Sequence, residues 1–268
     1  MSKNDYTRSN FRSSLLKQII IRIDYSGLTD LNGFVRQLKS TDWLQTLFTG
    51  YRLLKTNNIN FEINPETVEK KLVPIEINEA ENIHRFNDCS IQPLQEVTMD
   101  ISQNFICLTI KCNNNYDTID AYIKSVKQTV EALQDYDSYI NLNRIAIRKV
   151  NGKDFSSIES VYQTFEVMKY LEKNIIQDVI PIQKRYTDSF LSKESNLKVN
   201  FTRALKCFKD DNGDVIRFVL DIDCYADSFT LSDERVVDAG NVLVNINEEL
   251  FKLFKASVTE NFLSEGRK

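Results

Sequence analysis

The stretch NFTRALKCFKDDNGDVIRFVLDIDCY, at residues 200–225, constrains the fold of this chain more than any other. Apolar and polar residues alternate along both of its arms, and the pair Asn212 and Gly213 between them favours the two-residue type I′ turn of a β-hairpin. That turn places the apolar residues of both arms on one side, with Leu205 opposite Leu220, Cys207 opposite Phe218 and Phe201 opposite Cys224. The other side carries Arg217, Asp221 and Asp223.

The rest of the chain shows strand and helix patterns in turn. Residues 15–25, LLKQIIIRIDY, are short and β-branched, which predicts a buried strand. Extended runs separated by Asn and Pro residues follow between residues 51 and 112 and predict an antiparallel meander. Apolar residues at helical spacing predict helices over residues 29–38, 43–48, 119–133 and 233–262, the first of them capped by Thr29. A further helix is predicted to begin at a capping box formed by Ser156 and Glu159.

These elements predict an α+β fold of antiparallel sheets with helices packed on the sheet faces. The segments TMDISQNFICLTIKC and TRALKCFKDDNGDVIRFVLDI each read as two strands before a helix, so we expect two similar strand-strand-helix halves. The predicted organisation is a flexible arm at residues 1–14, an N-terminal half at 15–155 and a C-terminal half at 156–268. We expect the two halves to pack as one globular unit.

Charge and composition exclude several classes of protein. A net charge of −4 and a pI of about 5.3 give no general attraction to nucleic acid. Five cysteines, an odd and scattered set, predict free thiols in a reducing compartment, and the chain shows no signal peptide or membrane span, so we expect a cytoplasmic protein. The helix predicted over 233–262 mixes acidic residues with lysines on its polar side, which favours core packing or an oligomer contact over lipid.

Several kinds of catalytic and cofactor site are also excluded. The seven glycines form neither G-x-G-x-x-G nor a Walker A loop, and no G-x-S-x-G elbow is present. His84 is the only histidine, which rules out sites built from several histidines, and we expect it to be a surface or interface residue. The sequence therefore predicts no catalytic residue and no cofactor.

Two arginines offer a candidate binding site. In LNRIAIRKVNG, residues 142–152, strand alternation puts Leu142, Arg144, Ala146 and Arg148 on one face, with Ile145 and Ile147 on the other. Guanidinium groups bind carboxylates and phosphates through two hydrogen bonds at once, and Lys149 adds a further positive charge nearby. The same alternation also arises on an ordinary solvated face, so both interpretations stay open.

Two carboxylates offer an alternative. Asp221 and Asp223 lie two apart on a predicted strand and therefore share a face, where hard oxygen ligands can hold a divalent cation next to a phosphate. The outer face of an antiparallel sheet produces such pairs as well.

Three segments resemble those of a known family. LLKQIIIRIDY, INLNRIAIRKVN and LFKASVTENF are similar to the recurrent segments of a sporadically distributed family of uncharacterised prokaryotic proteins of similar length. Members carry an opening apolar strand after Pro-Leu, a central Arg-x-Gly-Leu-Arg-Tyr-Ile-Asn strand, and a closing Phe followed by Ser-Ile-Thr at a helix end. This chain keeps Arg144, Arg148 and Asn151 of the central strand. It departs from the pattern at Ser14, Ala146, Ile147 and Lys149, where the family has Pro, Gly, Leu and Tyr.

The resemblance implies a shared fold and brings no established activity with it. The patchy distribution of the family suggests, by analogy, a mobile-element, toxin-antitoxin or phage-defence context. With the resemblance included, the predicted binding residues are Arg144, Arg148, Lys149 and Asn151. We expect a non-catalytic binding or regulatory protein whose partner is another protein or a small anionic ligand. The alternative is a metal-dependent enzyme acting on a phosphoester or nucleotide through Asp221 and Asp223.

Overall fold

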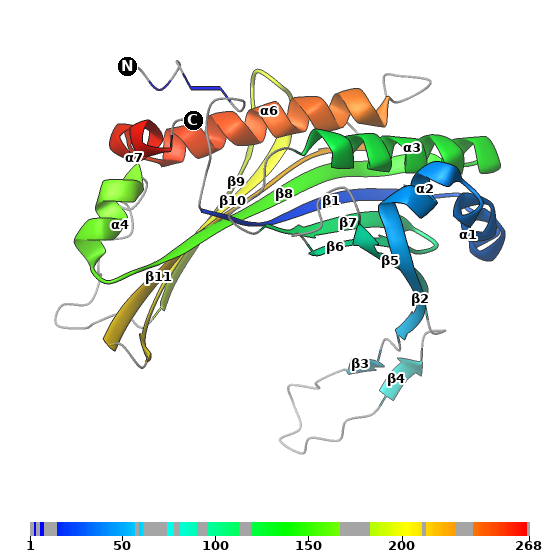
Figure 1. The fold of residues 1–268 in the computed structure, drawn as a ribbon, viewed down its shortest axis with the longest axis horizontal. Coiled ribbons are helices and arrows are strands. Elements are labelled where there is room, and N and C mark those ends of the chain that lie inside the picture. Colours follow the sequence, from blue (N-terminus) through cyan, green and yellow to red (C-terminus); the bar gives the residue numbers. More distant parts are fainter. Residues whose placement is uncertain are drawn as a thin grey trace.

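The computed structural model describes residues 3, 6–7, 15–56, 59–61, 74–77, 81–89, 96–112, 119–166, 183–210, 213–228 and 238–266. It shows an α+β fold in which helices pack on one open, antiparallel sheet of nine strands (Figure 1). The order of the strands across the sheet is β2-β5-β6-β7-β1-β8-β11-β10-β9, and β3 and β4 form a separate pair. None of the described helices is long and apolar enough to cross a membrane.

The strands are β1 (Leu16–Ser26), β2 (Phe48–Thr56), β3 (Ile59–Phe61), β4 (Pro74–Ile77), β5 (Glu81–Cys89), β6 (Glu96–Ile101), β7 (Phe105–Lys111), β8 (Asn141–Phe155), β9 (Gln183–Leu191), β10 (Lys198–Asp210) and β11 (Gly213–Asp227). The helices are α1 (Leu31–Lys39), α2 (Asp42–Leu47), α3 (Asp120–Tyr136), α4 (Ile158–Thr164), α6 (Ala239–Ser257) and α7 (Glu260–Glu265).

Two long helices, α3 and α6, lie along the same face of the sheet (Figure 1). The apolar stripe of α6 is buried there and includes Leu243, Ile246, Leu250 and Phe254. Core packing, one of the two uses expected for the C-terminal helix, is therefore confirmed for α6. The helix is shorter than predicted, because α6 ends at Ser257 and a separate helix, α7, begins after it; residues 229–237 lie outside the described part of the chain.

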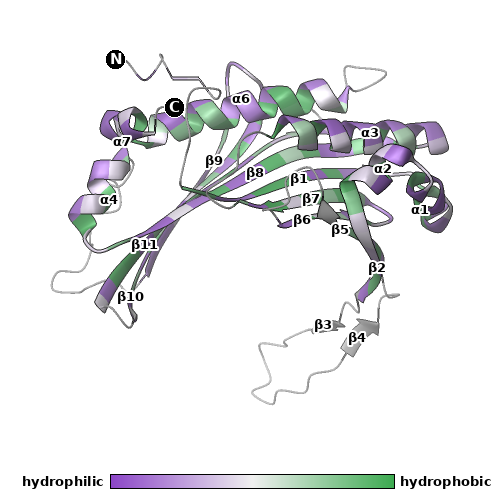
Figure 2. Cartoon of the chain, viewed as in Figure 1, coloured by the Kyte–Doolittle hydropathy of each residue, from purple (hydrophilic) through white to green (hydrophobic). Residues whose placement is uncertain are grey.

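The centre of the sheet is the antiparallel pair β1 and β8, in which Ile21 lies opposite Ile147. Ile145 and Ile147 are fully buried on the side that faces the helices. Hydrophobic and hydrophilic residues alternate along the strands (Figure 2), as one covered face and one open face require. We call the side opposite α3 and α6 the outer face of the sheet.

A β-bulge changes the position of one residue of the predicted arginine face. The register between β1 and β8 shifts by one residue between Arg144 and Leu142, so Leu142 lies opposite Tyr25, a residue buried on the helix side. The prediction that Leu142 shares a face with Arg144 is therefore wrong, because an extra residue in one strand reverses the alternation beyond it.

The predicted hairpin is present as β10 and β11, but its register differs from the prediction. Asp210 pairs with Gly213, so the connection consists of residues 211–212 rather than 212–213, and it lies outside the described residues. The observed pairs are Leu205 with Phe218, Cys207 with Ile216 and Phe201 with Ile222. The predicted apolar side survives because each partner changes by two residues, which preserves its face.

Other local predictions need smaller corrections. Asp30 rather than Thr29 caps α1, and Ser157 rather than Ser156 caps α4. The strands β5 and β9 were not predicted at all, because their sequences, ENIHRFNDC and QKRYTDSFL, lack a run of alternating apolar residues. Within the segment predicted as an arm, Tyr6 is buried and Lys3 forms an ion pair with Glu166.

Candidate functional site

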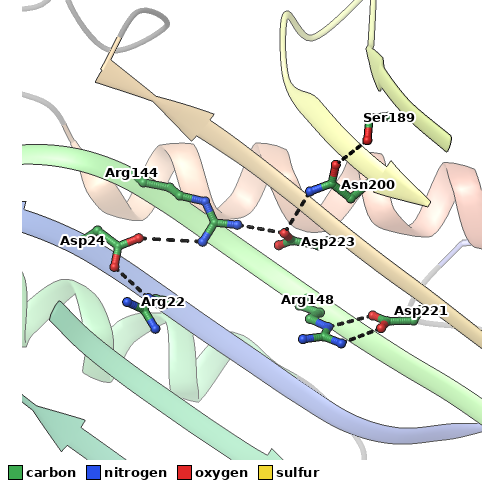
Figure 3. Close-up of polar contacts among 8 residues, drawn as sticks. All are labelled: Arg22, Asp24, Arg144, Arg148, Ser189, Asn200, Asp221 and Asp223. Carbon is green, nitrogen blue, oxygen red and sulfur yellow. Dashed lines mark hydrogen bonds and ion pairs between the residues drawn. The ribbon is translucent and has the colours of Figure 1, made fainter. Parts of the chain in front are cut away.

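The outer face carries a group of charged residues from three neighbouring strands, β1, β8 and β11. We call it the ion-pair cluster, and Figure 3 shows its members together with two neighbours from β9 and β10. The cluster consists of Arg22 and Asp24 on β1, Arg144 and Arg148 on β8, and Asp221 and Asp223 on β11. Residues that the sequence predicted for two competing sites therefore lie in one place.

Arg144 is held between two carboxylates and an aromatic ring. Its Nη2 donates a hydrogen bond to Oδ2 of Asp223 at 2.8 Å, and its Nη1 lies 3.7 Å from Oδ2 of Asp24. The guanidinium carbon is 4.5 Å from the centre of the Tyr225 ring, which is within the range of a cation–π contact. Asp24 in turn accepts a hydrogen bond from Nε of Arg22 at 2.6 Å. These contacts leave 26% of the Arg144 side chain exposed.

Arg148 makes a two-point contact with Asp221. Its Nε and Nη2 donate to Oδ1 and Oδ2 of Asp221 at 2.8 Å and 2.6 Å, the parallel geometry that fixes the plane of a guanidinium group. The hydrogen bonds from Arg148 to Asp221 also raise the pKa of Arg148, since they stabilise its charged form. The Arg148 side chain remains 45% exposed, whereas that of Asp221 is only 13% exposed.

Polar contacts continue from the cluster towards the β9 edge of the sheet. Nδ2 of Asn200 donates to Oδ2 of Asp223 at 3.4 Å, and the hydroxyl of Ser189 donates to Oδ1 of Asn200 at 2.8 Å (Figure 3). The carboxylate of Asp223 thus links β8, β11 and β10. The outer face is therefore an ordered polar surface in which carboxylates hold the arginines in place.

The four predicted binding residues do not form one site. Arg144 and Arg148 lie on the outer face, but Lys149 is on the helix side, where its Nζ donates to Oδ1 of Asn247 on α6 at 2.6 Å. Asn151 is 3% exposed and its Nδ2 lies 3.4 Å from the carbonyl oxygen of Leu220. Alternation along β8 separates odd-numbered from even-numbered residues here, so Lys149 and Asn151 lie on the opposite side of the strand from Arg144 and Arg148.

The two residues of the alternative metal site, Asp221 and Asp223, lie on the same face, but their carboxylate oxygens already accept hydrogen bonds from arginines. Asp221 and Asp223 share the outer face and lie next to Arg148 and Arg144, as a phosphoester site would require. Each carboxylate accepts hydrogen bonds from an arginine, so a divalent cation would have to compete with a bound guanidinium group. Within the described ranges, no group of three or more His, Cys, Asp or Glu residues is placed to hold a metal ion.

His84 differs from its prediction. It is 4% exposed rather than at the surface, and its Nδ1 lies 2.8 Å from the hydroxyl of Tyr51. Its Nε2 is buried and has no hydrogen-bond partner in the part of the chain that the structure describes. Burial, together with the positive charge of Lys39, lowers the pKa of His84. No sequence signal could have shown this, because the burial depends on the pairing of β2 with β5.

Comparison with known proteins adds no functional information. No family model matches the chain, and no curated protein matches it. One similar solved structure is described as the di-domain ARO/CYC StfQ from the steffimycin biosynthetic pathway; it is 11% identical, and the match covers 91% of this chain and 98% of that chain. Its TM-score of 0.17 is too low to support an argument about fold or function.

Proposed function

We propose that this chain is a non-catalytic binding protein whose outer face engages another protein or a small anionic ligand, with Arg144 and Arg148 as the main contacts. The observation that carries the proposal is the state of Arg148: its side chain is 45% exposed, yet two hydrogen bonds to Asp221 hold its orientation. A guanidinium group carries five N–H donors in a rigid plane, and these two bonds use only its Nε and Nη2. These two bonds leave the donors of Nη1 unused, and we propose that they meet the incoming acceptor.

Fixed orientation favours binding because less side-chain freedom is lost when the partner arrives. Free arginines lose up to about 2 kcal/mol of rotamer entropy on being ordered, and the contacts with Asp221 and Asp223 have already imposed much of that cost during folding. The cluster contains three guanidinium groups and three carboxylates, so it has no net charge. We therefore expect recognition by a matched pattern of charges rather than by general attraction to anions.

The proposed cellular location and biological context rest on the sequence. We propose the cytoplasm as the location, which agrees with the free thiols of Cys107, Cys112, Cys207 and Cys224. A mobile-element, toxin-antitoxin or phage-defence context enters only through the family resemblance, and the genes adjacent to this one would test it.

We also propose that the chain consists of two similar halves packed as one unit. In support, β1 is followed by short helices, a meander and α3, and β8 is followed by a short helix, a meander and α6. In each half, the first strand pairs with the last strand: β1 pairs with β7, and β8 pairs with β11. The two first strands, β1 and β8, also pair with each other. This division assigns β8 to the second half, so the boundary falls near residues 137–140 rather than at residue 155.

The function is tested by removing both arginines. We expect the double variant Arg144→Ala and Arg148→Ala to weaken binding at least about tenfold, the equivalent of about 1.4 kcal/mol. Binding is measured with host proteins captured from a lysate of the native host, and by calorimetry with citrate and pyrophosphate. The matched control is Arg217→Ala. Arg217 lies on β11, four residues before Asp221, and makes the same two-point contact with Asp154 on β8.

Two outcomes would contradict the proposal. Equal binding by the wild type, the double variant and Arg217→Ala would show that Arg144 and Arg148 take no part in recognition. A rise in Tm with Mn²⁺ that Asp221→Asn abolishes would favour the metal-dependent alternative. Circular dichroism on each variant establishes that it is folded before binding is compared.

A further inference from the structure

The strand β9 forms one edge of the large sheet and is unusually open. It pairs with β10 in an unbroken register from Leu191 opposite Lys198 to Gln183 opposite Lys206. Among the described residues, no strand pairs with its other side. Every residue of β9 except Lys184 is exposed, and three of these are large hydrophobic residues: Tyr186 at 42%, Phe190 at 40% and Leu191 at 52%.

Natural proteins usually protect an edge of this length. Common devices are a β-bulge, a proline, or charged residues along the strand, because unpaired N–H and C=O groups on a flat edge recruit another strand. The pairing of β9 with β10 contains no bulge, and the sequence QKRYTDSFL contains no proline. Its basic residues lie only in the first third of the strand. The second half of β9 is therefore a partly apolar edge on which Asp188 is the one charged residue.

The charges along β9 are arranged for pairing with an antiparallel copy of itself. Lys184 and Arg185 lie near the start of the strand. Asp188 lies beyond its middle, is 61% exposed and also forms an ion pair with Arg203 on β10. In an antiparallel pair centred on Tyr186, Lys184 lies opposite Asp188 of the second copy, and the two Tyr186 rings meet. A parallel pair would instead align the basic residues of both copies, and like charges directly opposite each other are destabilising.

We infer that two copies of this chain associate through β9, in an antiparallel pair centred on a two-fold axis at Tyr186. Such isologous contacts close on themselves and give a dimer with one continuous sheet. Main-chain hydrogen bonds supply the attraction, and the side chains of Tyr186, Lys184 and Asp188 set the register. The inference is independent of the proposed function, because the ion-pair cluster lies on the central strands and not at this edge.

The other edge of the sheet, β2, is a useful contrast. It also exposes two large apolar residues, Tyr51 at 42% and Leu53 at 45%. Its described charges, Arg52 and Lys55, are both positive, so a self-pair of β2 has no opposite charges to bring together in either direction. Lys39 also lies over the Tyr51 ring. The contrast assigns self-association to β9 and not to β2.

The test uses charge placed at the two-fold axis. Sedimentation of the full-length wild type should show the mass rising from that of one chain, 31.2 kDa, towards twice that value with concentration. A single-strand interface is small, so the range should extend to about 200 μM. Tyr186→Asp and Tyr186→Lys should each remain monomeric, because like charges then meet at the axis. An equimolar mixture of the two should recover dimers, because opposite charges meet.

Controls keep the outcome decisive. Leu53→Asp and Leu53→Lys place the same charges on β2 and should leave the dimer unchanged, and urea unfolding establishes that every variant is folded. The inference is overturned if the wild type keeps the mass of one chain over the whole range. It is equally overturned if the Leu53 variants dissociate the dimer, or if the mixture of Tyr186 variants fails to restore it.

Discussion

On the helix side of β8, Ile145 and Ile147 are fully buried, whereas Arg144 and Arg148 on the outer face of the same strand keep 26% and 45% of their side chains exposed. Burying an aliphatic side chain of this size contributes about 1.5–3 kcal/mol. A surface ion pair typically contributes about 0–1 kcal/mol. Residues one position apart therefore have different tasks: the helix side supplies the stability of the sheet, and the outer face arranges charges at little energetic gain.

The first way to break this comparison is to remove a large residue from the helix side. Phe218 is fully buried, and its ring centre lies 4.3 Å from that of Phe165. We expect Phe218→Ala to lower the free energy of unfolding by about 3–5 kcal/mol, because it combines lost burial with a cavity. Urea denaturation measures the change. The matched control is Phe190→Ala, at 40% exposure, which should cost less than half as much. Phe190 and Phe218 lie on the same side of the sheet, so a similar cost at both positions would show that burial does not set the cost of removing a phenylalanine ring.

The second prediction concerns the outer face. A double-mutant cycle with Arg148→Ala and Asp221→Ala should give a coupling energy of about 0.2–1 kcal/mol, because Arg148 is 45% exposed and water screens the pair. The coupling should shrink as sodium chloride is raised to about 1 M, where the Debye length is only about 3 Å. Urea denaturation of the four proteins at two salt concentrations supplies the measurement. A coupling above about 2 kcal/mol that resists salt would mean that the ion-pair cluster does stabilise the fold.

The smallest expected effect concerns His84, a titratable group on the helix side of the sheet. Burial and the charge of Lys39 hold its pKa in the folded chain below the ordinary value of 6.5. Above pH 6.5 the neutral ring is favoured in both states, and the fold keeps its full stability. As the pH falls from 6.5 towards the lowered pKa, the unfolded chain takes up the proton first, so the free energy of unfolding decreases.

Urea denaturation between pH 8 and pH 5 tests this sign. We expect the extra loss of stability below pH 6.5 to disappear in His84→Asn and to persist in Tyr51→Phe, which retains the imidazole. Identical pH profiles for the wild type and His84→Asn would refute the prediction.

Local patterns in the sequence predicted the elements whose apolar residues repeat regularly. The β10–β11 hairpin, α3, α6 and the central strands were found because alternation and helical spacing need only neighbouring residues. The strands β5 and β9 were missed because polar residues dominate them. The bulge before Arg144 was missed because it exists only as a mismatch between β8 and β1.

The candidate site shows the same limit. Alternation along β8 placed Arg144 and Arg148 on one face, and alternation along β11 did the same for Asp221 and Asp223. Nothing in either segment indicated that the two sets would neutralise each other, since Arg144 and Asp223 are 79 residues apart. Lys149 was grouped with the arginines by its position in the chain, and Asn151 by the family resemblance. Both lie on the covered side of the strand, away from the arginines.

The sequence by itself determined which residues share a side in the predicted strands wherever no bulge interrupts them, because the alternation of side chains is a property of the extended backbone. It also determined that one side of the sheet would be apolar and would need the stripes of α3 and α6 to cover it. The tertiary structure alone decided that β11 lies beside β8, that Asp221 and Asp223 meet the arginines, and that β9 is left at an edge. Strand order depends on how the whole chain buries its apolar surface, and no single segment carries that information.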